Sequence, residues 1–290
     1  MMEQMAEQAR RRRYSRIAFT LAALVLVAFS TLAQRRFRGQ RFPEHEEEAA
    51  RPTFPSGSEF HFIRVKYTDL PQYHRFFGFA SRSGQGDGWW LVDWPDADDH
   101  FSEGIKRLTR IDTGDPRFLR LTDDKLFDYP WIYATQTGWW GLTDAEIVRL
   151  REYLLRGGYL VVDDFWGSDW ELFRETMERV LPNRPITDIA ESDSVMHVLY
   201  DIQEKDRTFI PGTRHLWMGA GGTVTVHQPQ GTSPAWRAMY DDKNRMVVAV
   251  NYNTDVGDAW EYADSPLYPE QMTALAYRYG INYLIYSMTH

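Results

Sequence analysis

Two adjacent aspartates are the strongest candidates for chemistry in this chain of 290 residues. Asp163 and Asp164, the aspartate pair, follow the apolar run Tyr159–Val162, which is typical of a buried parallel strand. In open α/β sheets, ligands bind outside the carboxyl ends of such strands. Carboxylates there can bind a hard cation such as Ca²⁺ or Mg²⁺, or act as general acid and base. The alternative is structural, with one aspartate capping a helix that begins near Ser168 and the other bonding to neighbouring loops.

A second acidic segment lies near the end of the chain. It follows the apolar run Met246–Tyr252 and contains Asp255, Asp258, Trp260 and Glu261. If the two preceding strands are parallel neighbours, this segment approaches the aspartate pair, and together they form a polar pocket or a metal site. The acidic spacing is not that of an EF-hand loop, so we predict no defined metal site. The alternative is a solvated loop that Trp260 anchors to the core.

Basic and aromatic residues complete the candidate site. Arg64 and Lys66 lie two residues apart on a predicted strand and share one face, so either could pair with an acidic segment or bind an anion. Several tryptophans at strand ends could form a stacking platform for a glycan or a peptide, or could simply cover the sheet edges. The candidate ligand-binding residues are Asp163, Asp164, Arg64, Tyr67, Trp94, Trp166, Asp258, Trp260 and Glu261.

Several enzyme classes lack the residues that they need. The chain contains no cysteine, which removes thiolate nucleophiles, thiolate metal sites and disulfides together. An HExxH motif, a histidine pair at i, i+4 spacing and a G-x-S-x-G elbow are all missing from the sequence, so zinc hydrolysis and a serine elbow have no support. We therefore assign no catalytic residue and expect no cofactor.

Charge is unevenly distributed along the chain. Residues 1–41 hold nine arginines and two acids, so 39 of the 41 acidic residues follow them, against 24 of the 33 basic ones. Phosphate contacts need lysine and arginine, so the acidic remainder is a poor nucleic-acid binder.

The basic residues belong to a targeting segment. Arg10–Arg13 and Arg16 precede the run Ile17–Ala33, which has no polar face. The order of basic, apolar and small residues is that of a secretory signal. The run of 17 residues is also at the lower limit for a membrane-spanning helix. We expect either a permanent anchor or a cleaved signal, and an exported domain in both cases.

The predicted organisation follows from these segments. We expect a basic region at 1–16, an anchor or signal segment at 17–33, a linker at 34–58 and one α/β domain at 59–290. With the anchor, the protein lies in the inner (cytoplasmic) membrane with its domain in the periplasm or at the cell exterior. After cleavage it is secreted.

Hydrophobic periodicity predicts the elements of this domain. The expected strands are Phe60–Tyr67 (half-exposed), Trp89–Val92, Trp131–Thr135, Tyr159–Val162, Trp236–Tyr240 and Met246–Tyr252. The expected helices are Phe101–Leu108, a helix from the capping box Thr143–Glu146 to Gly157, Ser168–Val180, and Pro269–Tyr279 with Gly280 as its cap. Ile281–Tyr286 fits either a strand or further helix.

The order of several short motifs resembles the DUF4159 family, a bacterial family of undetermined function, over roughly residues 59–288. The motifs include Phe62-Ile63-Arg64-Val65-Lys66-Tyr67, Trp94-Pro95-Asp96-Ala97-Asp98, Leu126-Phe127-Asp128-Tyr129-Pro130, Asp163-Asp164-Phe165 and Gly257-Asp258-Ala259-Trp260-Glu261. The family is similar to class I glutamine amidotransferase domains. The resemblance implies a three-layer, flavodoxin-like α/β sandwich with a mostly parallel sheet, here preceded by one N-terminal hydrophobic helix. It does not imply the amidotransferase reaction, whose nucleophile is a cysteine.

These observations predict a membrane-associated envelope protein with a non-catalytic binding domain. Its expected partners are the membrane, through the N-terminal helix, and a glycan, a peptide or another envelope protein. The alternative is a hydrolase that uses Asp163, Asp164 and Glu261, with or without a divalent cation.

Overall fold

The computed structural model describes residues 57–74, 88–219 and 222–290. The predicted basic region, the anchor or signal segment and almost all of the linker lie outside these residues. Within the described part of the chain, no helix has the length and apolar character needed to cross a membrane. Pro52–His290 forms a compact unit, and both of its hydrophobic cores lie between Phe60 and Tyr286. The buried residues of both cores therefore all belong to this unit.

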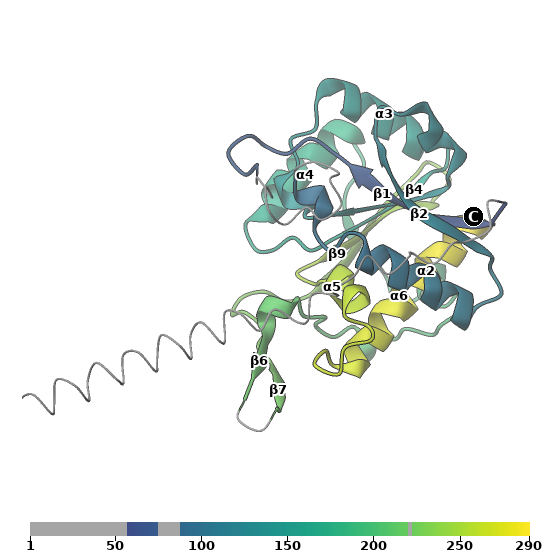
Figure 1. The fold of residues 1–290 in the computed structure, drawn as a ribbon. Helices are drawn as coiled ribbons and strands as arrows, with labels where there is room; N and C mark the ends of the chain where they lie inside the picture. Colours follow the sequence, from purple (N-terminus) through teal and green to yellow (C-terminus); the bar gives the residue numbers. More distant parts are fainter. Residues whose placement is uncertain (1–56, 75–87, 220–221) are drawn as a thin grey trace, which may run out of the picture. The chain divides into compact units, whose positions relative to one another are not determined.

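A seven-stranded, mostly parallel sheet forms the centre of the domain (Figure 1). In spatial order its strands are β2 (Thr113–Arg120), β1 (Phe60–Lys66), β3 (Trp131–Thr135), β4 (Tyr159–Asp163), β9 (Met246–Tyr252), β8 (Ala235–Tyr240) and β5 (Thr187–Asp188). Neighbours among the first five strands are parallel, whereas β8 is antiparallel to β9 and β5 is antiparallel to β8. The parallel strands therefore direct their carboxyl ends to one edge of the sheet.

Helices cover both faces of the sheet. One face packs on α2 (Asp96–Leu108), α5 (Val256–Glu261) and α6 (Glu270–Thr289), and the other on α3 (Asp144–Leu155) and α4 (Asp169–Val180) (Figure 1). Short 3-10 helices lie at Trp89–Leu91, Asp124–Asp128, Thr137–Trp139, Ser194–Met196, Glu204–Asp206 and Thr213–His215. Because strand side chains alternate, β3 contributes Tyr133 to the first core and Ala134 to the second. The prediction of an α/β domain with a mostly parallel sheet is confirmed.

The β3–α3–β4 unit agrees with its sequence pattern. Thr143 accepts the N–H of Glu146, and the Glu146 carboxylate accepts the N–H of Thr143, which completes the predicted capping box. After α3, Gly157 takes a φ of 98°, a conformation that glycine adopts without strain. The β8–β9 pair is also confirmed.

One predicted strand is wrong, and two predicted elements are present but differ from the prediction in exposure or length. β1 is not half-exposed but lies inside the sheet, and Arg64 on it is fully buried because it is paired. Trp89–Leu91 is a 3-10 helix rather than a strand. α6 passes through Gly280 and includes Ile281–Tyr286. A Cβ on Gly280 would lie 2.5 Å from Phe101, so this glycine allows close packing and does not end the helix.

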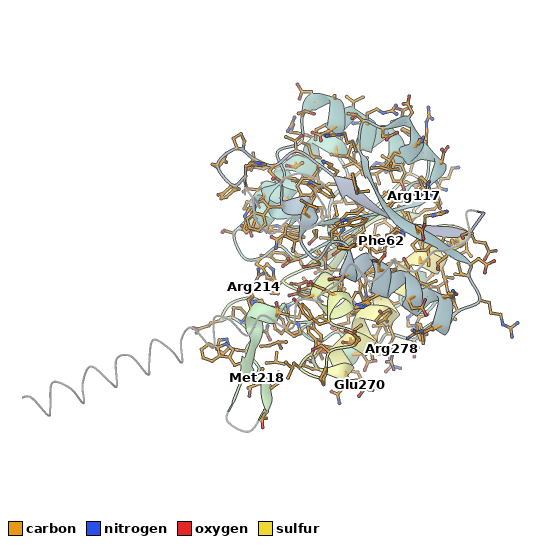
Figure 2. All side chains as sticks on the ribbon, viewed as in Figure 1. Phe62, Arg117, Arg214, Met218, Glu270 and Arg278 are labelled. Atoms are coloured by element: carbon orange, nitrogen blue, oxygen red, sulfur yellow. The ribbon has the colours of Figure 1, made fainter. Side chains whose placement is uncertain are left out.

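The strands β2, β5, β6 and β7 had no prediction. The edge strand β2 contains Gly114, Asp115 and Pro116, which are residues that strands disfavour but that edges tolerate. β6 (Leu216–Met218) and β7 (Val224–Val226) form a separate two-stranded sheet. Figure 2 labels Phe62 inside the layered body and Met218 on this hairpin, away from the body.

Replacing Phe101 with alanine tests the packing of α2. The buried Phe101 ring lies 4.2 Å from Trp260 and 5.8 Å from Phe62, measured between ring centroids. Phe101→Ala should lower the free energy of unfolding by about 3–5 kcal/mol, because the truncation leaves a cavity. Leu108→Ala is the control on the same helix, since Leu108 is 53% exposed, and should change it by less than about 0.5 kcal/mol. Chemical denaturation measures both, and equal losses would contradict this packing.

Candidate functional site

Asp163 is the last residue of β4, at the carboxyl edge of the sheet, and it is fully buried. One of its oxygens accepts the Tyr133 hydroxyl at 2.6 Å, and the other accepts the N–H groups of Val256 at 2.8 Å and Gly257 at 3.0 Å. Burial raises the pKa of Asp163 to about 7, with Asp164 adding to the rise and these donors opposing it. Asp163 thus joins β3 and β4 to the start of α5.

Asp164 adopts a left-handed backbone conformation with a φ of 49°, which aspartate tolerates better than most residues. Its carboxylate accepts hydrogen bonds from Trp166 Nε1 at 2.6 Å, from an Arg214 guanidinium nitrogen at 3.1 Å and from the Gln136 side-chain amide. It also shares a hydrogen bond with the Asp255 carboxyl group. The expectation that one aspartate caps the next helix is wrong for this side chain, which turns to a different set of partners.

The second acidic segment is a short helix rather than a loop. Asp255 is the N-cap of α5, and its carboxylate accepts the N–H of Asp258 at 2.8 Å. The Asp258 carboxylate accepts the N–H and, at 3.1 Å, the hydroxyl of Thr213. Glu261, at the end of α5, shares a hydrogen bond with the Asp258 carboxyl group. The predicted approach of this segment to the aspartate pair is therefore observed. Asp163 accepts backbone N–H groups of α5, and Asp164 shares a hydrogen bond with Asp255.

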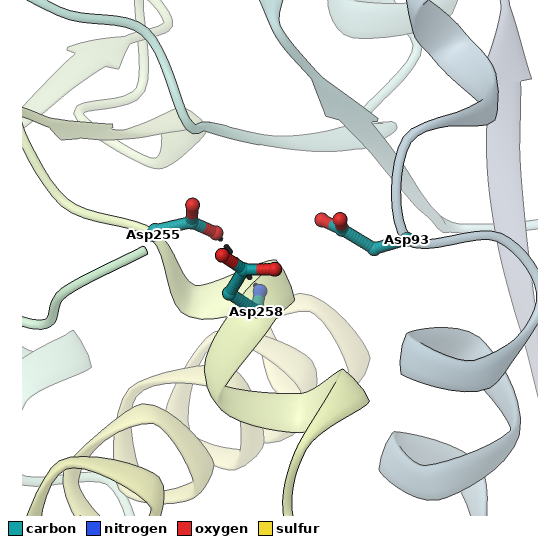
Figure 3. Close-up of side chains that lie close together, drawn as sticks. All are labelled: Asp93, Asp255 and Asp258. Atoms are coloured by element: carbon teal, nitrogen blue, oxygen red, sulfur yellow. Dashed lines mark hydrogen bonds between the residues drawn. The ribbon is translucent and has the colours of Figure 1, made fainter. Parts of the chain in front are cut away.

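Asp93 was not among the predicted residues, yet it faces the same site. It follows the 3-10 helix Trp89–Leu91, with a φ of 63°. Figure 3 shows its carboxylate directed at Asp255 and Asp258, and one oxygen from each of the three lies within 4.8 Å of the others. Asp93 Oδ2 is buried without a hydrogen-bond partner among the described residues. We call Asp93, Asp164, Asp255, Asp258 and Glu261 the acidic cluster.

Arg64 positions Asp93 instead of facing a ligand. Its guanidinium is buried in an ion pair with Asp98 on α2, with Nε 3.0 Å from each carboxylate oxygen. It also donates to the carbonyls of Trp90 at 3.2 Å and Val92 at 2.7 Å. The turn that carries Asp93 is thereby held on β1 and α2.

The other predicted residues lie in different surroundings. The Tyr67 hydroxyl donates to the carbonyls of Thr135 and Gln136, so it supports the turn after β3. Trp260 is fully buried in the core. The Trp94 ring packs against Phe118. These three side chains serve the framework around the site.

Trp166 is the predicted tryptophan that contacts the acidic cluster, through its bond to Asp164, and the Arg214 guanidinium lies 4.9 Å from its ring centroid. Trp89 and Trp139 form a separate pair with centroids 4.3 Å apart. Trp90 and Trp140 are each 1% exposed. The tryptophans therefore do not form one stacking platform.

The family model described as "Domain of unknown function (DUF4159)" matches residues 61–288. The chain belongs to the DUF4159 family. No protein of curated function matches its sequence.

The DUF4159 domain of this chain concentrates carboxyl groups in a buried place. Burial raises the pKa values of Asp93, Asp255 and Glu261 well above their usual range, and the neighbouring carboxylates raise them further. Asp164 has a pKa of about 6, because burial raises it while Arg214 lowers it. Arg214, whose side chain is half exposed, is the cation that is paired with the cluster among the described residues.

The raised pKa values predict a pH-dependent stability. The pKa values of these carboxyl groups in the folded domain exceed the value of about 3.9 in the unfolded chain. As the pH rises, the unfolded chain therefore loses these protons first. The cluster's stabilising contribution is thus complete below about pH 4, and it is lost as the pH rises through 6, the pKa of Asp164, and beyond. Asp255→Asn removes one charge and keeps an acceptor for the Asp258 N–H. It should raise the free energy of unfolding by about 1–3 kcal/mol at pH 8, and barely change it near pH 4.

Chemical denaturation between pH 4 and 8, with a chelator present, measures this difference. Asp242→Asn is the matched control, because the Asp242 side chain is 91% exposed. If Asp255→Asn left the slope of the unfolding free energy against pH unchanged, the pKa of Asp255 would not be raised in the folded domain.

Proposed function

We propose that this domain is a non-catalytic binding module that takes up a cation at the acidic cluster. The observation that carries the proposal is the convergence of Asp93, Asp255 and Asp258, with one buried Asp93 oxygen that has no partner among the described residues. A buried polar atom without a hydrogen-bond partner lowers the stability of the fold. A bound cation would provide that partner and neutralise the neighbouring charges.

A hard divalent cation fits the dimensions of this group. Ca²⁺ binds oxygen ligands at 2.3–2.6 Å, so two ligands on opposite sides of the ion are up to about 5 Å apart. The three carboxylate oxygens lie within 4.8 Å of one another. Asp93, Asp255 and Asp258 would hold the ion, and Glu261 would support Asp258 through the bond between their carboxyl groups.

The hydrolase alternative, which uses Asp163, Asp164 and Glu261, has weaker support. In its favour, the pKa values of about 7 for Asp163 and about 6 for Asp164 suit proton transfer near neutral pH. Against it, Asp163 is fully buried and both of its oxygens accept hydrogen bonds within the domain. A general acid or base must be accessible to its substrate. We therefore prefer the binding module to the hydrolase.

We also propose a relationship to class I glutamine amidotransferase domains at the level of the fold. Support comes from the parallel strands, whose spatial order β2-β1-β3-β4-β9 follows the flavodoxin-like order 2-1-3-4-5. In such folds the ligand lies beside the strands where the order reverses, here β1 and β3. Asp93 comes from the connection that follows β1, and Gln136 directly follows β3. The relationship implies no amidotransferase activity, because the chain has no cysteine.

A thermal-shift experiment tests the cation site. Saturating Ca²⁺, Mg²⁺ or Mn²⁺ should raise the melting temperature by several degrees, since a ligand at about 100 times its Kd adds roughly 2.7 kcal/mol. Asp93→Asn should abolish the shift and keep the fold, because asparagine also tolerates the left-handed backbone. Asp242→Asn, on an exposed turn, should respond like the unaltered chain. The site is refuted if none of the three cations shifts the unaltered chain, or if Asp93→Asn responds equally.

We further propose that Ile17–Ala33 holds the protein in the inner membrane with its domain exported. The apolar run and its flanking arginines support this. The mature protein should keep its original N-terminus and sediment with membranes, and removal of residues 1–33 should release it into the soluble fraction. Intact mass spectrometry and fractionation measure these outcomes. A mature chain that begins at Gln34 would show cleavage and secretion instead.

A further inference from the structure

The β6–β7 hairpin extends away from the rest of the domain as an arm (Figure 1). The arm consists of residues 215–219 and 222–227 in the described chain. Its strands pair as a two-stranded sheet, through Leu216 with Val226, Trp217 with Thr225 and Met218 with Val224. It has no strand partner in the central sheet. At its base, Leu216 packs against the first core and His215 is buried against Trp166 and Phe209, whereas Trp217 and Met218 further along are exposed.

The arm differs in composition from the rest of the chain. Between Arg214 and Arg237 there is no aspartate, glutamate, lysine or arginine. At ordinary composition a stretch of this length would hold about six charged residues. Trp217 is 67% exposed and Met218 is 39% exposed, although both are large and apolar. The arm thus presents an uncharged, partly apolar surface on an otherwise acidic domain.

We infer that the arm docks on a lipid bilayer, with Trp217 and Met218 in the interface between headgroups and acyl chains. Tryptophan is enriched at that depth, because its ring is apolar and its N–H can still bond to water or headgroups. Three strand residues at about 3.3 Å each span roughly 10 Å, which matches the ~5–10 Å over which interfacial segments bury their apolar side chains.

The backbone of the arm is compatible with this depth and not with a deeper one. The hairpin closes on itself, with the Gly219 N–H donating to Thr223 at 2.8 Å and the Gly222 N–H to Gly219 at 3.2 Å. The outer edges of a two-stranded sheet still need water or headgroups for their remaining N–H and C=O groups. The interface supplies both, whereas the hydrocarbon core does not.

A bilayer fits better than a protein partner for a second reason, which rests on the membrane anchor proposed above. The linker 34–58 reaches at most about 90 Å, so the domain always stays near the membrane. At such an effective concentration even a weak contact is occupied. A protein partner would gain specificity from charges on the arm, and the arm has none of either sign.

A single fluorescent label tests the inference. Because the chain has no cysteine, Met218→Cys provides one site for an environment-sensitive nitrobenzoxadiazole dye. Residues 52–290, which form one compact unit, are given an N-terminal histidine tag, and circular dichroism first establishes that they are folded. The tag binds them to vesicles of phosphatidylethanolamine and phosphatidylglycerol that contain a nickel-chelating lipid. The tag replaces the natural anchor, so the result does not depend on residues 1–33.

The dye at position 218 should show a blue shift on vesicles and be quenched by brominated acyl chains. The control Val148→Cys, on α3 with 54% exposure, should show neither effect, and Trp217→Ser combined with Met218→Cys should lose most of both. An unshifted dye at position 218 overturns the inference. So does a shift that occurs without vesicles and grows with protein concentration, because it would identify a second copy as the partner. Failure of the natural anchor would be seen separately, by fractionation of the full chain.

Discussion

The contact between Asp163 and the start of α5 is the interaction on which the site depends. A fully buried carboxylate accepts the Tyr133 hydroxyl from β3 and two N–H groups from the first turn of α5. Those N–H groups have no partner within their own helix, and negative charge is favourable at a helix N-terminus. Without this carboxylate the first turn of α5 would be buried with unmet donors. Because α5 is fixed in this way, its own acids are held beside Asp164 rather than free to separate in solvent.

A buried ion pair restrains the opposite wall of the site. The Arg64 guanidinium bonds to Asp98 and to the carbonyls of the turn that leads to Asp93. Burial lowers the pKa of Arg64, but the adjacent Asp98 more than compensates and raises it overall. Removing either partner would leave one charge uncompensated in the interior, which is strongly destabilising. Contacts outside the acidic cluster therefore hold its carboxylates close together. Their mutual repulsion persists in the folded domain, and a bound ligand would relieve it.

Local patterns predicted the elements well where a single physical rule decided the outcome. The capping box at Thr143 and the continuous apolar run of β4 depend on neighbours in sequence, and both are confirmed. Arg64 was misread, because alternation of polar and apolar residues looks the same whether the polar member faces water or a buried Asp98. Asp93 was missed for a related reason: its role comes from a turn that Arg64 holds and from a helix more than 160 residues away in sequence. The residues next to Asp93 in the sequence, Trp94 and Pro95, do not indicate this contact.

The arm and the acidic cluster share a short segment of chain. Thr213, two residues before the arm, bonds to Asp258, and Arg214, directly before it, bonds to Asp164. A Cβ on Gly212 would lie 2.5 Å from an Asp255 oxygen, so the chain passes close against the cluster here. A force on the arm would therefore act first on the two residues that bond to the carboxylates. Since Arg214 is the cation paired with the cluster in the described chain, its displacement would leave Asp164 with more unbalanced negative charge. Thr213 and Arg214 therefore connect the start of the arm to the carboxylates of the acidic cluster.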